Sequence, residues 1–211
     1  MSIDEFYSDF RQEVIGRANA SENFSKAAFL EYLFPKLEEQ GYPAFEQSDF
    51  RKKLRKEGFL AIDAWANDSE GRLFLAYADF RQTENIASMS ENEMIENFAR
   101  LERFFLTCRK KDFVQGLEEA SSCKPLAQLI FEKQAEIKSV SLLIFSNAKL
   151  SNRIKAMKDR TAEGFRFMRE VWDLERLWQM ETSGYEREAI VIDFTEDSKK
   201  GVPCLAVPTA D

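Results

Sequence analysis

Two aspartates stand inside otherwise apolar stretches of the sequence. Asp63 lies in FLAIDAWA and Asp79 lies in LFLAYADFR. Burying a carboxylate without a partner is costly, so each aspartate requires a cation, a metal ion or several hydrogen-bond donors. Because carboxylates suit Mg²⁺ or Mn²⁺, which polarise phosphoryl oxygens and activate water, Asp63 and Asp79 predict a divalent metal site. The alternative is an ion pair between Asp79 and Arg81, with Asp63 accepting backbone hydrogen bonds.

Several other kinds of chemistry are excluded by composition. The chain contains no histidine, which removes Ser-His-Asp and Cys-His catalysis and histidine-ligated zinc. The three cysteines, Cys108, Cys123 and Cys204, are widely spaced and form no CxxC motif, so they suggest neither a zinc knuckle nor a disulfide framework. Any reaction must therefore use carboxylates, Lys, Tyr, Ser or Cys.

A basic stretch precedes the first aspartate. Arg51, Lys53 and Arg55 belong to the run RKKLRK at residues 51–56. If they line a strand beside the aspartates, they could bind phosphates and make nucleic-acid binding strongly dependent on salt. The alternative is a solvated edge strand whose positive charges discourage pairing with another strand.

The overall composition is that of a folded protein. Of the 211 residues 44% are hydrophobic, and the net charge of −7 excludes a uniformly basic coat. The first fifteen residues carry five charged side chains, which does not fit a signal peptide, and no apolar run reaches membrane-spanning length. We therefore expect a cytoplasmic protein that does not enter a membrane.

Hydrophobic periodicity predicts the elements that position these residues. It predicts a helix over 1–18, a helix from Ser25 that Pro35 divides into two short pieces, and a three-stranded meander over 50–81. A capping box of Ser90 and Glu93 opens a long helix. The remaining elements are helices over 126–137, 150–157 and 173–181, and strands over 140–145, 165–171 and 189–194.

This order of elements indicates the α/β class. We expect one domain over 1–211, with a mixed central sheet flanked by helices. Within it the αβββαβ unit spans 25–146, and residues 147–211 add further α/β elements.

The arrangement resembles the PD-(D/E)XK nuclease fold, a restriction-endonuclease-like core. Asp63 matches its first acid, Asp79-Phe80-Arg81 matches D/E-x-K, and Glu31 matches the glutamate of the first helix. The resemblance implies a catalytic group of Asp63, Asp79, Arg81 and Glu31. Arg81 replaces the lysine, and because arginine keeps its proton it could stabilise a phosphate but could not act as a general base.

A resemblance over nearly the whole chain is to the N-terminal region of the abortive-infection phage-resistance (AIPR) family of bacterial proteins. The order and spacing of several segments carry it: AFLEYLFPKLEEQG, AIDAWANDSEGRLFLAYADFRQ, SENEMIENFARLERFF, VWDLERLWQMETSGYEREAIVIDF and GVPCLAVP. The resemblance implies phage defence, a nuclease-like N-terminal domain and a longer protein that continues beyond Asp211.

Three functions follow from these patterns. The first is a nuclease-like domain of an anti-phage protein that hydrolyses phosphodiesters with Mg²⁺ or Mn²⁺. The second is a catalytically degenerate domain that binds nucleic acid, or a phage or host protein. The third is a homo-oligomer in which the helix containing Met94 to Phe105 and the N-terminal helix form a dimer interface.

Overall fold

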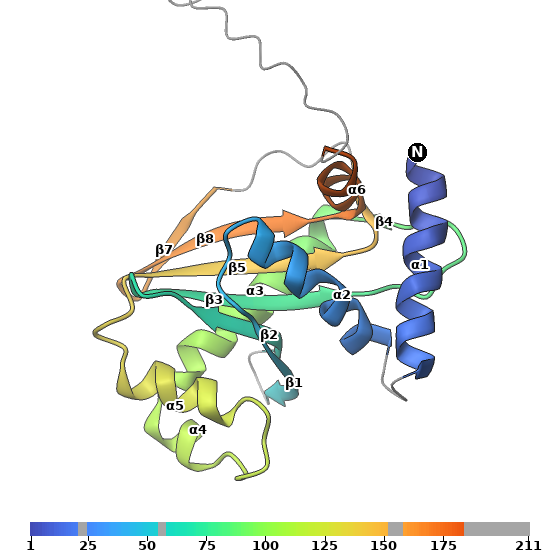
Figure 1. Cartoon of the computed structure of the whole chain (residues 1–211). Coiled ribbons are helices and arrows are strands. Elements are labelled where there is room, and N and C mark those ends of the chain that lie inside the picture. Colours follow the sequence, from blue (N-terminus) through green and yellow to red (C-terminus); the bar gives the residue numbers. More distant parts are fainter. Residues whose placement is uncertain (21–24, 55–57, 152–157, 184–211) are drawn as a thin grey trace, which may run out of the picture.

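The fold is built on one six-stranded sheet. The computed structural model describes residues 1–20, 25–54, 58–151 and 158–183. The strand order is β1-β2-β3-β5-β8-β7; β1, β2 and β3 are antiparallel neighbours, β3, β5 and β8 are parallel, and β7 is antiparallel to β8. The strands are β1 (Glu46–Leu54), β2 (Gly58–Asn67), β3 (Arg72–Asp79), β5 (Ser139–Ser146), β7 (Arg160–Ala162) and β8 (Phe165–Trp172). The predicted α/β fold with a mixed central sheet is confirmed (Figure 1).

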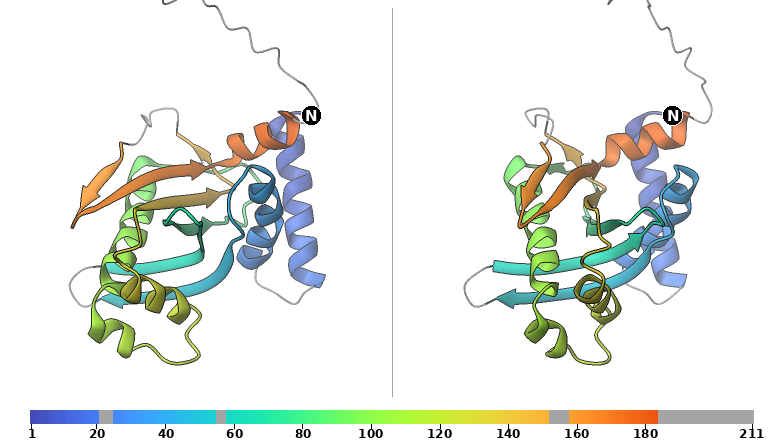
Figure 2. Two further views of the ribbon diagram at one scale, coloured as in Figure 1. Left: turned by 60° about the vertical axis from the view of Figure 1, so that its left-hand side comes forward. Right: turned by 90° about the vertical axis from the view of Figure 1, so that its left-hand side faces the viewer.

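Helices cover both faces of this sheet (Figure 2). One face carries α1 (Ile3–Ala20), α2 (Ser25–Glu39) and α6 (Leu174–Ser183), and the other carries α3 (Glu91–Cys108), α4 (Lys111–Gln115) and α5 (Lys124–Glu132). The central strand β3 alternates between the two layers, with Leu73 and Leu75 toward α3 and Phe74 and Ala76 toward α2. None of the helices among the described residues combines the length and hydropathy that crossing a membrane requires.

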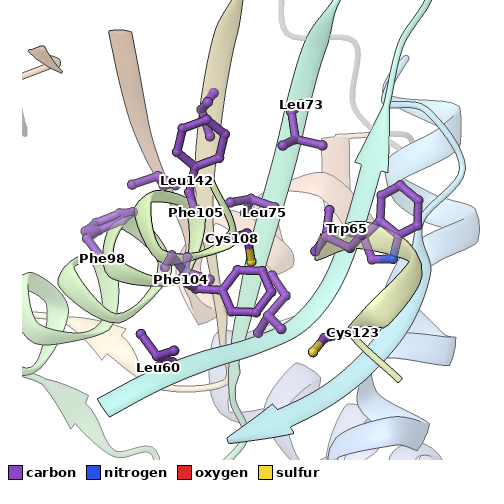
Figure 3. Close-up of a cluster of buried hydrophobic side chains, with 14 of the residues drawn as sticks. Leu60, Trp65, Leu73, Leu75, Phe98, Phe104, Phe105, Cys108, Cys123 and Leu142 are labelled. Carbon is purple, nitrogen blue, oxygen red and sulfur yellow. The ribbon is translucent and has the colours of Figure 1, made fainter. Parts of the chain in front are cut away.

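The core beneath α3 is dense in phenylalanine (Figure 3). Phe98, Phe104 and Phe105 are fully buried and pack with strand residues of the sheet. Cys108 lies in the same cluster, and its burial raises the pKa of the thiol well above the ordinary value of 9.0. Because the thiolate is the reactive form, Cys108 acts as a small core residue.

Helix α3 begins at the predicted capping box. The side-chain oxygen of Ser90 accepts a hydrogen bond from the Glu93 N–H (3.3 Å), and Glu93 Oε2 accepts one from the Ser90 N–H (2.7 Å). These two bonds satisfy backbone donors that a helix start would otherwise leave without partners.

Helix α2 differs from the prediction. It is a single helix through Pro35, so the division into two short pieces is wrong. Proline removes one backbone donor, but Leu33 and Leu37 on either side of it are both fully buried. Packing against the sheet therefore maintains the helix across the missing hydrogen bond.

Other differences lie at element ends and in the small second sheet. Strand β1 begins at Glu46, four residues before the predicted start, and α5 ends at Glu132, before the predicted 137. In place of the start of a helix over 150–157, Lys149–Leu150 forms β6, which pairs in parallel with β4 (Ser88–Met89). Residues 152–157 and the predicted strand over 189–194 lie outside the described residues.

Candidate functional site

The turn between β2 and β3 fixes the register in which the two strands pair near the site. Asp68 Oδ1 accepts hydrogen bonds from the backbone N–H groups of Glu70 (2.9 Å) and Arg72 (2.8 Å). Gly71 adopts a φ of 84°, and an added Cβ would lie 2.6 Å from the carbonyl oxygen of Glu136. This closely packed turn determines which β3 residues lie beside the aspartate of β2.

Strands β2 and β3 separate at Asp63. The β2–β3 pairing extends from the turn as far as Ala64, which lies opposite Ala76. Beyond this pair, the Ala78 N–H of β3 bonds to the side chain of Asp63 rather than to the backbone of β2: it donates a hydrogen bond to Asp63 Oδ2 at 2.8 Å. This contact brings the Asp63 carboxylate next to the backbone of the residue that precedes Asp79.

Two cations hold the carboxylate of Asp63. Arg51 Nη2 lies 2.7 Å from each of its oxygens, and Lys26 Nζ lies 2.7 Å from Oδ1. The Asp63 side chain is 0% exposed, whereas those of Arg51 and Lys26 are 36% and 29% exposed. Arg51 Nη1 also donates to the carbonyl oxygens of Phe50 (2.8 Å) and Ile62 (3.1 Å). The cost of burying Asp63 is therefore offset by charge-assisted hydrogen bonds from β1 and α2.

Asp79 lies at the carboxyl end of β3 and pairs with Arg81. Arg81 Nε donates to Asp79 Oδ2 at 3.0 Å, and the hydroxyl of Ser146 donates to the same oxygen at 3.0 Å. Asn147 accepts from the Arg81 N–H and donates to the Arg81 carbonyl oxygen, both at 2.8 Å. The carboxyl ends of the parallel strands β3 and β5 are thus joined by polar contacts at an edge where α/β folds commonly bind ligands.

Arg81 also reaches the start of α3. Its Nη2 donates to Glu93 Oε1 at 3.0 Å, and its Nη1 donates to the Ser88 carbonyl oxygen at 2.9 Å. The backbone and side-chain hydrogen bonds from Ser90, together with the positive charge of Arg81, hold the pKa of Glu93 below its ordinary value. Arg81 is therefore fully occupied as a link between β3 and α3.

Glu31 lies away from the Asp63 carboxylate. It is exposed on α2, and the α2 residue that contacts Asp63 is Lys26. Five residues along a helix correspond to a rotation of about 140° and a rise of about 7.5 Å, so Lys26 and Glu31 point in different directions. The described geometry supports a link between Asp63 and Lys26, and it does not bring Glu31 to the carboxylate of Asp63.

The predicted phosphate-binding residues have different surroundings. Arg51 contacts Asp63, as described above. Lys53 is exposed on β1, and its Nζ lies 5.8 Å from the centre of the Phe59 ring. Arg55 lies outside the described residues. β1 is an edge strand of the described sheet, which fits both alternatives for the basic stretch.

Sequence reasoning missed three residues of this region. Lys26 completes the contacts of Asp63, and Tyr77 lies within cation–π distance of both Arg51 (5.1 Å) and Arg100 (5.6 Å). Arg100 Nη1 also donates to the Tyr77 hydroxyl at 3.0 Å. Lys26 and Arg100 sit on amphipathic helices among other charged residues, and neither position carries a motif that would have identified it.

The arrangement of Asp63 does not fit a resident divalent cation. Both carboxylate oxygens already contact Arg51, and Lys26 and the Ala78 N–H take the remaining hydrogen-bonding positions. Within the described ranges, no group of three or more Asp, Glu, Cys or His side chains could surround a metal ion. The geometry shows the predicted alternative, which is an Asp79–Arg81 ion pair with Asp63 accepting a backbone hydrogen bond.

Comparisons with known proteins agree with the family resemblance. No curated protein and no solved structure matches the chain significantly. The family described as the abortive infection phage resistance protein N-terminal domain matches residues 29–179, well over half of the chain. This span includes the turn, both aspartates and the ends of β3 and β5. The chain therefore belongs to the AIPR N-terminal domain family, which implies a role in resistance to phage through abortive infection.

Proposed function

We propose that this domain contributes to resistance to phage through abortive infection by binding nucleic acid without hydrolysing it. The observation that carries the proposal is the Asp63 carboxylate, whose oxygens are held by Arg51, Lys26 and the Ala78 N–H. A metal ion at Asp63 would have to displace both cations from a fully buried carboxylate. Arg81, which stands where the nuclease motif has lysine, cannot lose its proton to activate water.

The basic stretch of β1 supports the binding part of this proposal. Lys52 and Lys53 are exposed on an edge strand, next to Arg51. Their charges contrast with the net charge of −7 of the chain. Local positive charge on an acidic protein favours contact with a phosphate backbone, with an affinity that falls as salt rises.

The competing proposal is hydrolysis dependent on Mg²⁺ or Mn²⁺, with the ion at Asp63 and Asp79, Glu31 as a further ligand and Arg81 stabilising the phosphate. A cleavage assay distinguishes the two proposals. The protein is incubated with labelled single-stranded and duplex DNA and RNA, with and without each metal. We expect no metal-dependent cleavage by the wild type. Cleavage that requires the metal and disappears in Asp79→Ala would support hydrolysis and overturn our proposal.

Binding is tested with two double variants of equal charge. Lys52→Gln/Lys53→Gln removes two exposed positive charges of β1, and Lys110→Gln/Lys111→Gln removes two exposed charges at the start of α4. We expect the first variant to weaken binding and to reduce its salt dependence, and the second to have little effect. Equal effects of the two variants, or no binding by the wild type, would contradict the proposal.

A further inference from the structure

A connected series of cationic and aromatic side chains runs from the β1–β2 hairpin to the site. We call it the cation–aromatic row, and it consists of Lys53, Phe59, Arg103, Arg100, Tyr77 and Arg51. These residues come from β1, β2, β3 and α3. Arg103 contacts the backbone carbonyl oxygen of Phe59, Arg103 and Arg100 share the carboxylate of Glu96, and the other neighbours in the row contact each other through their side chains.

At the hairpin end, the ring of an exposed phenylalanine lies beside a lysine, and an arginine contacts its backbone. Phe59 is 45% exposed, one of three large apolar side chains among the described residues with high exposure. Lys53 Nζ lies 5.8 Å from the centre of its ring, and Arg103 Nη1 donates to its carbonyl oxygen at 2.8 Å. An added Cβ on Gly58 would lie only 2.6 Å from Arg103 Nη1, so this arginine packs closely against the hairpin.

At the other end, Tyr77 is contacted by Arg100 and Arg51 through its ring and hydroxyl. The two parts of the row meet on α3, where Glu96 contacts both Arg100 (3.5 Å) and Arg103 (3.0 Å). The row is therefore continuous across α3.

The charge of the row is positive. Its three arginines contact the carboxylates of Glu96, Asp49 and Asp63, and Lys53 lies over the Phe59 ring. Lys26 also contacts Asp63. With Lys26 included, five cations face three carboxylates. Edge protection of β1 accounts for its lysines, but it gives no reason for an exposed phenylalanine beside them.

We infer that the cation–aromatic row binds single-stranded nucleic acid, with an unpaired base stacked on Phe59 and phosphates contacted by Lys53, Arg100 and Arg103. This inference rests on the proposed function and specifies the form of nucleic acid. Aromatic rings among cations suit single strands, because unpaired bases expose faces for stacking that a duplex keeps covered.

The stacking role is tested by fluorescence anisotropy with labelled oligo-dT, oligo-U and a DNA duplex of equal length. We expect Phe59→Ala to weaken single-strand binding about tenfold, and Phe59→Trp to retain it, since both rings can stack. Ile95→Ala is the matched control, because Ile95 is 46% exposed on α3 and lies outside the row. Circular dichroism confirms that each variant is folded.

The phosphate role is tested with a pair of arginines. Arg103 and Arg109 have side chains 25% and 24% exposed, and each pairs with one glutamate. We expect Arg103→Gln to weaken binding and to lower the slope of log affinity against log salt by about 0.7, and Arg109→Gln to leave both unchanged.

The outcomes separate this inference from the proposed function. Wild-type binding that Phe59→Ala and Arg103→Gln leave unchanged, or duplex binding as tight as single-strand binding, overturns the inference alone. Absence of any nucleic-acid binding by the wild type overturns the inference and the proposed function together. A loss confined to the Phe59 and Arg103 variants, with retention in Phe59→Trp, supports the inference.

Discussion

Asp49 and Asp63 contact the same two cations from different environments. Lys26 lies 2.7 Å from a carboxylate oxygen of each, but the Asp49 side chain is 69% exposed and the Asp63 side chain is 0% exposed. Removing one partner of a buried ion pair leaves the others without compensation, whereas exposed pairs contribute little. We expect Asp63→Asn to lower the free energy of unfolding by about 3 kcal/mol and Asp49→Asn by less than about 1 kcal/mol.

Urea denaturation of the two variants at neutral pH measures this difference. The charge change and the two cations are the same in both variants. The two aspartates differ in burial, in the Ala78 hydrogen bond and in the distance to Arg51, which is 2.7 Å for Asp63 and 3.8 Å for Asp49. Similar small decreases in the free energy of unfolding for Asp63→Asn and Asp49→Asn would mean that Asp63 contributes little to the stability of the fold. The aspartate would then be available for another role, and the proposal of a non-hydrolytic domain would lose its main support.

At the scale of elements, α3 begins at a carboxylate that also joins it to β3. Glu93 accepts from Ser90 and Arg81, and its pKa is held below the ordinary value of 4.5. A carboxyl whose pKa is lowered in the folded state stabilises the protein above pH 4.5. This contribution is lost as the pH falls through the pKa of the folded state. We therefore expect Glu93→Gln to be less stable than the wild type at neutral pH and to lose less stability between pH 5 and pH 3.

Thermal unfolding of both proteins across this range measures the effect. Ser90→Ala provides a comparison, since it removes the cap and is expected to cost about 1 kcal/mol while Arg81 still contacts Glu93. Parallel pH profiles of the wild type and Glu93→Gln would show that Glu93 does not link acid stability to the start of α3.

The elements also show which parts of the site can be predicted from sequence. Side chains two apart on a strand share a face, so the Asp79–Arg81 pair could be anticipated, and the capping box follows from local spacing. The contact between Lys26 and Asp63 joins residues 37 positions apart in the sequence. It depends on how α2 packs on the sheet and on where β2 and β3 separate, which periodicity does not specify. The prediction that Pro35 divides α2 was wrong for the same reason, because the packing of α2 on the sheet outweighed the local preference of proline to end a helix.

At the scale of the whole molecule, two tyrosines join the N-terminal part of the described chain to its C-terminal part. The Tyr32 hydroxyl on α2 donates to Glu181 on α6 at 2.9 Å. The Tyr42 hydroxyl, between α2 and β1, donates to Glu170 on β8 at 2.8 Å. Burial, followed by the neighbouring carboxylates, raises the pKa of both tyrosines above the ordinary value of 10.0.

These raised pKa values predict a loss of stability at alkaline pH. Above pH 10 the unfolded chain releases the phenolic protons of Tyr32 and Tyr42 while the folded protein retains them, so the free energy of unfolding falls as pH rises. We expect Tyr32→Phe/Tyr42→Phe to be less stable at pH 8, because it lacks two hydrogen bonds, but to lose less stability between pH 9 and pH 11. Urea denaturation across this range measures both curves, and the lysines and arginines common to the two proteins cancel in the difference. Curves that remain parallel above pH 10 would show that these protonated hydroxyls do not join the N-terminal and C-terminal parts of the described chain.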